Sequence, residues 1–283
     1  MSQSYRSVSS VVCLSAITSF VATTQSASAD YMNDFTNPAT ASQFSTDRAN
    51  PGGFDVNTSN PGDLTINVRT ADAPGQENGF FNVHGIATNG GDFNAGYGSI
   101  LSASLFVPTN WANNVNRRAG DLWARINNPL QPNVGLHNYP TVGIYHYGGA
   151  SPTYGPFVSL FTPTPGGFDG NPLTDDLILD LTPGTGGVPL INYDNYNTLA
   201  LRLVAGGTVD YLFNDIVVAS ITDATYNQVG VEIEQALLQG WQGADDYTVR
   251  FGSLSVVPEP SSLALIGVGA LALLRRRRQA RAV

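Results

Sequence analysis

Lysine is absent from the 283 residues, so all 13 basic side chains are arginines. Cysteine occurs once, as Cys13, which excludes an intramolecular disulfide framework. The three histidines, His84, His137 and His146, show no metal-ligand spacing, and no Gly-x-Ser-x-Gly nucleophile motif occurs. The sequence therefore gives no indication of a zinc enzyme, a thiol enzyme or a serine hydrolase.

The C-terminal segment has three parts: a Pro258-Glu259-Pro260 break, an uncharged run from Ser261 to Leu274, and a basic cluster formed by Arg275, Arg276, Arg277 and Arg278. As a helix, the apolar run would span roughly 21 Å, against about 30 Å of membrane hydrocarbon. Its length alone would also suit a buried core helix. Four adjacent arginines instead favour a cytoplasmic membrane interface, so we predict one short transmembrane helix at 261–274.

This arrangement resembles the PEP-CTERM sorting signal of bacterial exported proteins, which carries Pro-Glu-Pro, one hydrophobic helix and an arginine-rich end. The resemblance covers residues 257–283. It implies an exosortase-type processing enzyme as partner, and a protein that is either tethered to the inner membrane or released to the cell surface or extracellular matrix. An ordinary tail anchor is the alternative and has the same topology.

The N-terminus agrees with export. Arg6 is the only charge before Asp30, an apolar stretch follows, and Ala27-Ser28-Ala29 supplies small residues for cleavage. We predict a secretory signal peptide at 1–29, handled by the Sec machinery and removed between Ala29 and Asp30. Residues 30–257 then form the exported domain and 258–283 the sorting signal.

The exported domain is strongly acidic. Residues 30–257 contain seven arginines and 21 acidic residues, for a formal charge of −14, compared with −9 for the whole chain. Such a charge repels polyphosphates, so nucleic acid is not an expected partner. The same negative charge favours binding of divalent cations, or else serves only to keep the domain soluble.

Period-two alternation between turn residues predicts an all-β domain. The clearest unit is a meander from Leu199 to Ile221, with turns at Gly206-Gly207 and Asn214-Asp215. A parity change at Gly252 predicts a β-bulge. The one helical turn that we expect lies at Gln235–Gln239. Many strands without crossover helices favour a two-sheet antiparallel sandwich, a jelly roll.

The meander from Leu201 to Ala219, followed by the strand from Tyr247 to Val256, is similar to concanavalin A-like, LamG-type sandwiches. Folds of this type include glucanases with acids at Glu-x-Asp-x-x-Glu on one strand. Glu232 and Glu234 have the alternate spacing that places two carboxylates on one face, as glycoside hydrolysis requires. Leu237 stands where the third acid would be, so solvated strand carboxylates are the favoured interpretation.

Oxygen-rich clusters are candidate calcium ligands, although none matches an EF-hand loop and turn formation is the plainer explanation. They are Asp169, Asp175, Asp176, Asp245 and Asp246. Aromatic side chains near predicted loops suit stacking on sugar rings, or else cover the sandwich edges. These are Tyr145, Tyr147, Tyr154 and Trp241.

Three functions remain open. The first is a non-enzymatic protein of the bacterial surface or extracellular matrix, which we favour. The second is a carbohydrate-binding module for extracellular polysaccharide, with or without calcium. The third is a divergent glycoside hydrolase that uses Glu232 and Glu234.

Overall fold

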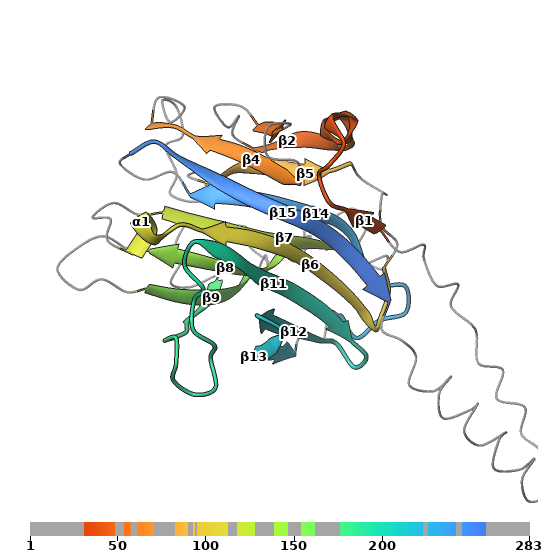
Figure 1. Cartoon of the computed structure of the whole chain (residues 1–283). Coiled ribbons are helices and arrows are strands. Elements are labelled where there is room, and N and C mark those ends of the chain that lie inside the picture. Colours follow the sequence, from red (N-terminus) through yellow and green to blue (C-terminus); the bar gives the residue numbers. More distant parts are fainter. Residues whose placement is uncertain are drawn as a thin grey trace, which may run out of the picture.

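Two antiparallel sheets packed face to face form the computed structural model (Figure 1), as the sequence predicts. It describes residues 31–48, 54–57, 62–70, 83–89, 93, 95–112, 118–127, 139–146, 154–161, 176–222, 226–241 and 245–258. The predicted signal peptide and the predicted membrane helix at 261–274 lie outside these residues. Within them, no helix is long and apolar enough to cross a membrane.

The first sheet has eight strands in the order β13-β12-β11-β6-β15-β4-β3, with β1 paired to β15. Its strands are β1 (Tyr31–Asn33), β3 (Phe54–Asn57), β4 (Asp63–Val68), β6 (Ser99–Val107), β11 (Asn195–Val204), β12 (Thr208–Phe213), β13 (Ile216–Thr222) and β15 (Tyr247–Pro258).

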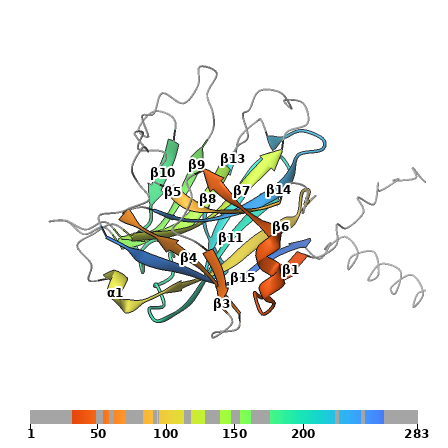
Figure 2. The same cartoon turned by 90° about the horizontal axis from the view of Figure 1, so that it is seen from above.

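The second sheet has seven strands in the order β10-β9-β8-β7-β14-β5-β2. They are β2 (Phe44–Arg48), β5 (Val83–Thr88), β7 (Arg118–Asn127), β8 (Tyr139–His146), β9 (Tyr154–Phe161), β10 (Asp176–Asp180) and β14 (Glu232–Trp241). Two short helical segments, η1 (Pro38–Gln43) and α1 (Thr109–Ala112), complete the described elements. Seen from above, the sheets form two layers (Figure 2).

Alternate positions on the facing strands build the core. Leu101, Ala103, Leu105 and Val107 of β6 are buried, while the residues between them are partly exposed. The sandwich core is one large cluster to which both sheets contribute. Period two therefore predicts correctly which side chains point inward.

The helical turn expected at Gln235–Gln239 is wrong, because these residues belong to β14. Leu238 faces the main core, whereas Leu237 packs with Ala87 and Trp123 in a small cluster on the opposite face of the same sheet. Because both faces of β14 are buried there, its apolar residues are consecutive and imitate a helical pattern.

The predicted meander is confirmed as β11-β12-β13. Asn214 and Asp215 both have positive φ, 48° and 64°, as a two-residue hairpin turn between Phe213 and Ile216 requires. The other turn is longer than expected. Since Val204 pairs with Thr208, the connection holds three residues and includes Ala205.

Three bulges interrupt the described ladders, and one of them lies in β13, where the pairing with β12 shifts between Tyr211 and Leu212 and leaves Val218 as the extra residue. The predicted one lies at Gly252, where the β15–β6 register shifts between Phe251 and Ser253. The third, unforeseen bulge lies in β14, where the pairing with β7 shifts between Ile233 and Gln235 and leaves Glu234 as the extra residue.

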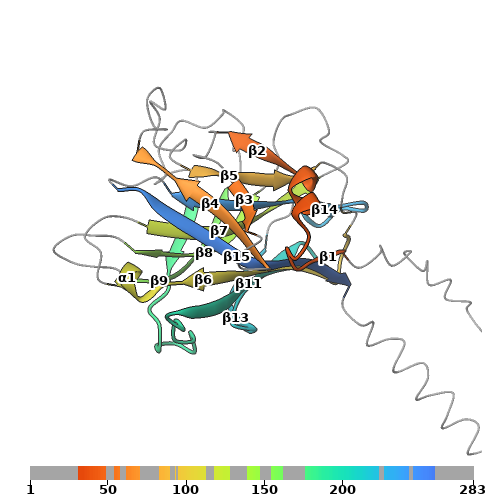
Figure 3. The same ribbon diagram turned by 45° about the horizontal axis from the view of Figure 1, so that its top comes forward.

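The short strand β1 lies beside the end of β15 (Figure 3). Tyr31 pairs with Val256, and Asn33 pairs with Leu254. Tyr31, the first residue of β1, therefore lies beside the C-terminal end of β15. The two ends of the described sandwich are close together in space.

Candidate functional site

An open groove of about 470 Å³ lies on the outer face of the eight-stranded sheet. Its lining comes from four strands and one turn: Gly62, Asp63, Ser104, Tyr196, Arg250, Gly252 and Ser253. Asp63, Ser104 and Arg250 alternate with the core residues Leu64, Leu105 and Phe251. The same alternation that builds the core therefore gathers polar groups on the opposite face.

A nearly buried carboxylate organises the groove. Asp63 is 3% exposed and accepts a hydrogen bond from Arg250 Nε at 3.1 Å, a second from Arg250 Nη2 and one from the Tyr196 hydroxyl. The Arg250 guanidinium lies 4.4 Å from the centroid of the Phe106 ring, which in turn meets Tyr196 edge-on at 5.4 Å. Charge is thus neutralised inside the groove, and the tyrosine ring is held in one orientation.

Gly252 allows the Tyr196 ring to lie directly against β15. A Cβ atom at this position would come within 2.7 Å of the Tyr196 ring. The bulge at Gly252 therefore provides space for the ring as well as a bend in the strand. Tyr196 stays 37% exposed, so part of its surface remains open to solvent.

Serine hydroxyls line the groove and the sheet surface next to it. Ser104 and Ser253 are 2.8 Å apart between their hydroxyl oxygens, and so are Ser102 and Ser255 one step further along the same two strands. Each hydroxyl keeps spare donor or acceptor capacity after this contact. The surface therefore offers an aromatic ring beside a row of hydroxyls.

The sequence did not reveal this groove. Asp63, Tyr196 and Arg250 are separated by more than 50 residues in the chain and belong to no motif. Strand alternation does place Arg250 on the face opposite Val249 and Phe251, but nothing in the pattern pairs it with Asp63.

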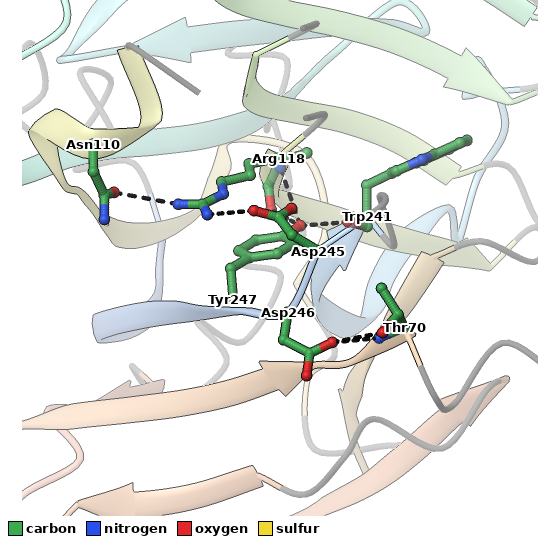
Figure 4. Close-up of polar contacts among 8 residues, drawn as sticks. Thr70, Asn110, Arg118, Trp241, Asp245, Asp246 and Tyr247 are labelled. Carbon is green, nitrogen blue, oxygen red and sulfur yellow. Dashed lines mark hydrogen bonds and ion pairs between the residues drawn. The ribbon is translucent and has the colours of Figure 1, made fainter. Parts of the chain in front are cut away.

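Asp245, a candidate calcium ligand, forms an ion pair with Arg118. Its carboxylate lies 2.5 Å from Arg118 Nη2, and Arg118 Nη1 also reaches Asn110 at 3.4 Å (Figure 4). Beside them, the Tyr247 hydroxyl bonds to the carbonyl of Trp241 at 2.5 Å and to the backbone of Ala119. This cluster joins the ends of β7, β14 and β15.

Asp246 is hydrogen-bonded to Thr70, just after the end of β4. It accepts hydrogen bonds from the amide and the hydroxyl of Thr70, at 2.7 and 2.9 Å, and these bonds lower the pKa of Asp246 below its usual value (Figure 4). The described residues contain no group of three or more metal-ligating side chains. Asp169 and Asp175 lie outside the described residues, and Asp176 begins β10, where only its backbone is described.

Glu232 and Glu234 both lie at the start of β14, in unequal surroundings. Glu234 binds Arg125 Nε at 2.7 Å, and Arg125 also donates to Gln235 at 2.8 Å. Burial, and after it the negative charge of Glu234, raises the pKa of Glu232. The bulge at Glu234 interrupts the regular alternation that the sequence predicts for this pair.

Three of the four aromatic candidates, Tyr145, Tyr154 and Trp241, lie on the seven-stranded sheet. Tyr145 is buried on β8, 5% exposed, and Trp241 is partly buried against the small cluster that contains Trp123. Tyr154 begins β9, where only the backbone is described, and Tyr147 lies outside the described residues. Of the predicted stacking residues whose side chains are described, only Trp241 is partly open to solvent.

Most targeting residues lie outside the described part of the chain. These are Ala27, Ala29, Asp30, Glu259, Pro260 and the arginines from 275 to 278. Pro258 is the last residue of β15.

Comparison with protein families identifies one motif in this chain. Residues 256–278 match the PEP-CTERM protein-sorting motif, which indicates an exported protein that an exosortase processes. No curated protein matches the chain significantly.

Among solved structures, the chain is similar to an endo-1,3-β-glucanase from Streptomyces sioyaensis, with 13% identity, a TM-score of 0.51, and coverage of 80% of this chain and 94% of the other. A laminarinase from Flavobacterium sp. UMI-01 aligns at 11% identity and a TM-score of 0.47, over 80% and 98% of the two chains. At such identities the likeness concerns the fold. The chain thus carries a PEP-CTERM sorting motif at the end of a domain with the concanavalin A-like jelly-roll fold.

Proposed function

We propose that this exported protein is a non-enzymatic component of the cell surface or extracellular matrix that binds neutral polysaccharide. The observation that carries the proposal is the groove on the eight-stranded sheet. It combines a fixed, partly exposed tyrosine ring with serine hydroxyls and an internally neutralised Arg250–Asp63 pair. Aromatic rings stack on sugar rings, and hydroxyls and guanidinium groups bond to sugar hydroxyls.

The charge of the domain favours a neutral glycan. With a formal charge of −14 between residues 30 and 257, the domain repels uronic acid polymers. Within the groove, Arg250 already bonds to Asp63 through two of its nitrogens. An open groove on a sheet surface also suits a long chain better than a small molecule, which usually occupies an enclosed pocket.

Binding is tested with the full chain in mild detergent, by affinity electrophoresis against laminarin, xylan and alginate. We expect retardation by a neutral polymer and none by alginate. Tyr196→Ala should weaken binding by about tenfold, since truncation of an anchoring aromatic typically costs more than about 1 kcal/mol. Gly252→Ala should weaken it as well, because the new methyl group displaces the Tyr196 ring.

Tyr193→Ala is the matched control, because Tyr193 is 38% exposed and lies outside the groove. Unchanged retardation of Tyr196→Ala and Gly252→Ala, with both variants folded by circular dichroism, would remove the groove from the proposal. Absence of binding to any neutral polymer would leave a purely structural surface protein.

A second candidate is glycoside hydrolysis at Glu232 and Glu234. One observation favours it: burial raises the pKa of Glu232, and Glu234 beside it is ion-paired with Arg125, while glycoside hydrolysis needs a general acid near a second carboxyl group. The test is release of reducing ends from laminarin and xylan. Activity that Glu232→Gln abolishes would establish this candidate, whereas activity that survives the substitution would exclude it.

A further inference from the structure

Strand β13 forms an outer edge of the eight-stranded sheet. It pairs with β12 on one side, and no described strand pairs with its other side (Figure 1). An edge of this kind presents a row of backbone N–H and C=O groups that can pair with another strand.

Charge and proline, two common protections against such pairing, are absent from β13, and the one irregularity of the strand is a bulge at Val218. Its seven residues, Ile-Val-Val-Ala-Ser-Ile-Thr, include no charge and no proline. The edge strands β2, β3 and β10 are shorter than β13 and charged: β2 contains Asp47 and Arg48, β3 contains Asp55, and β10 contains Asp176 and Asp180. Charged side chains on an edge discourage association with other strands.

The exposed strand is also apolar and firmly held. Ile216 is 48% exposed and Val217 is 44% exposed, among the largest apolar exposures described. Hydroxyl contacts fix β13 to β12, between Ser220 and Asp210 at 2.6 Å and between Thr208 and Thr222 at 2.8 Å. The edge is therefore preorganised, which reduces the entropy lost on pairing.

We infer that β13 is an interface for a second copy of this chain. Two β13 strands would pair antiparallel about a two-fold axis and join the two eight-stranded sheets into one continuous sheet. A strand that pairs with itself this way satisfies the symmetry of a closed dimer. The neutrality of β13 allows two acidic domains to meet without carboxylates opposite each other, which pairing at the β10 or β3 edges would bring about.

The first test is the mass of the full chain in mild detergent, measured by sedimentation velocity over a concentration series. We expect a dimer, and we expect Val217→Lys to raise its dissociation constant by about tenfold or more, because the symmetric interface carries the substitution twice. Val229→Lys is the matched control, since Val229 is 93% exposed and lies outside the strand, between β13 and β14. This variant should remain dimeric.

Cross-linking localises the contact. In a Cys13→Ser background, which lacks cysteine, Ser220→Cys places a thiol on β13 and Ser45→Cys places one on the charged edge strand β2. A short bismaleimide should give a dimer band with the first variant only. A monomer at all concentrations would overturn the inference. So would a dimer that withstands Val217→Lys and shows no cross-link at position 220.

Discussion

Two buried tyrosines differ in what their hydroxyl groups contact. The Tyr247 hydroxyl accepts a bond from the amide of Ala119 at 3.1 Å and bonds to the carbonyl of Trp241 at 2.5 Å. The Tyr211 hydroxyl is buried without a hydrogen-bond partner, and burial raises the pKa of Tyr211 above its usual value of 10.0. One hydroxyl therefore joins three strand ends, while the other only loses hydration.

Removing each hydroxyl should consequently have opposite effects. Tyr247→Phe is expected to lower the free energy of unfolding by about 1–3 kcal/mol, since it leaves two buried backbone groups without their partner. Tyr211→Phe, which deletes an unsatisfied polar atom, should be neutral or stabilising. Urea denaturation of both variants gives the comparison, and equal destabilisation would contradict the assignment.

The carboxyl of Glu232 should make stability depend on pH. Because the pKa of Glu232 is raised in the folded protein above its usual value of 4.5, the stabilisation from its bound proton is complete below pH 4.5. That stabilisation is lost as the pH rises through the folded-state pKa. Glu232→Gln should thus have a higher Tm than the parent at pH 7 and a similar Tm at pH 4.

Glu234→Gln serves as the contrast at the neighbouring position. It removes the ion pair with Arg125 and should lower the Tm at pH 7. If Glu232→Gln also lowered the Tm at pH 7, the unfavourable charge that we assign to Glu232 would be refuted.

At the scale of elements, glycines set the distance between the two sheets. Gly120 of β7 pairs with Gly240 of β14, and both point toward the other sheet. A Cβ atom on Gly120 would come within 2.6 Å of Leu105, and one on Gly240 within 2.7 Å of Val68 and Val249. Core side chains of the eight-stranded sheet thus fill the space above this glycine pair.

Gly120→Ala should therefore overpack the core. We expect a loss of about 1–3 kcal/mol in the free energy of unfolding, measured by urea denaturation, because Leu105 must leave its position. An unchanged midpoint would mean that the sheets separate easily at this point.

Elements were more predictable from the sequence than contacts. Alternation located the meander and the bulge at Gly252, because one buried face imposes period two along a strand. It failed at β14, where Leu237 and Leu238 are buried on opposite faces. The groove was not predictable, since the contact between Asp63 and Arg250 depends on strand register across 187 residues of chain.

At the scale of the whole molecule, the sorting motif begins inside the fold. Its first matched residue, Val256, is buried in the core and pairs with Leu101 of β6. No linker therefore separates the last core strand from Pro258. The sequence predicted the motif by its composition, but only the structure shows that it is continuous with a central strand.

This continuity has a mechanical consequence. The strand that leads to the tail, β15, lies inside its sheet and is bonded to β6, β4 and β1. Inter-strand hydrogen bonds run perpendicular to the strands, so tension along β15 loads many of them at the same moment. A pull on the C-terminal segment would have to shear these bonds together instead of peeling them apart in succession, which is a mechanically strong geometry.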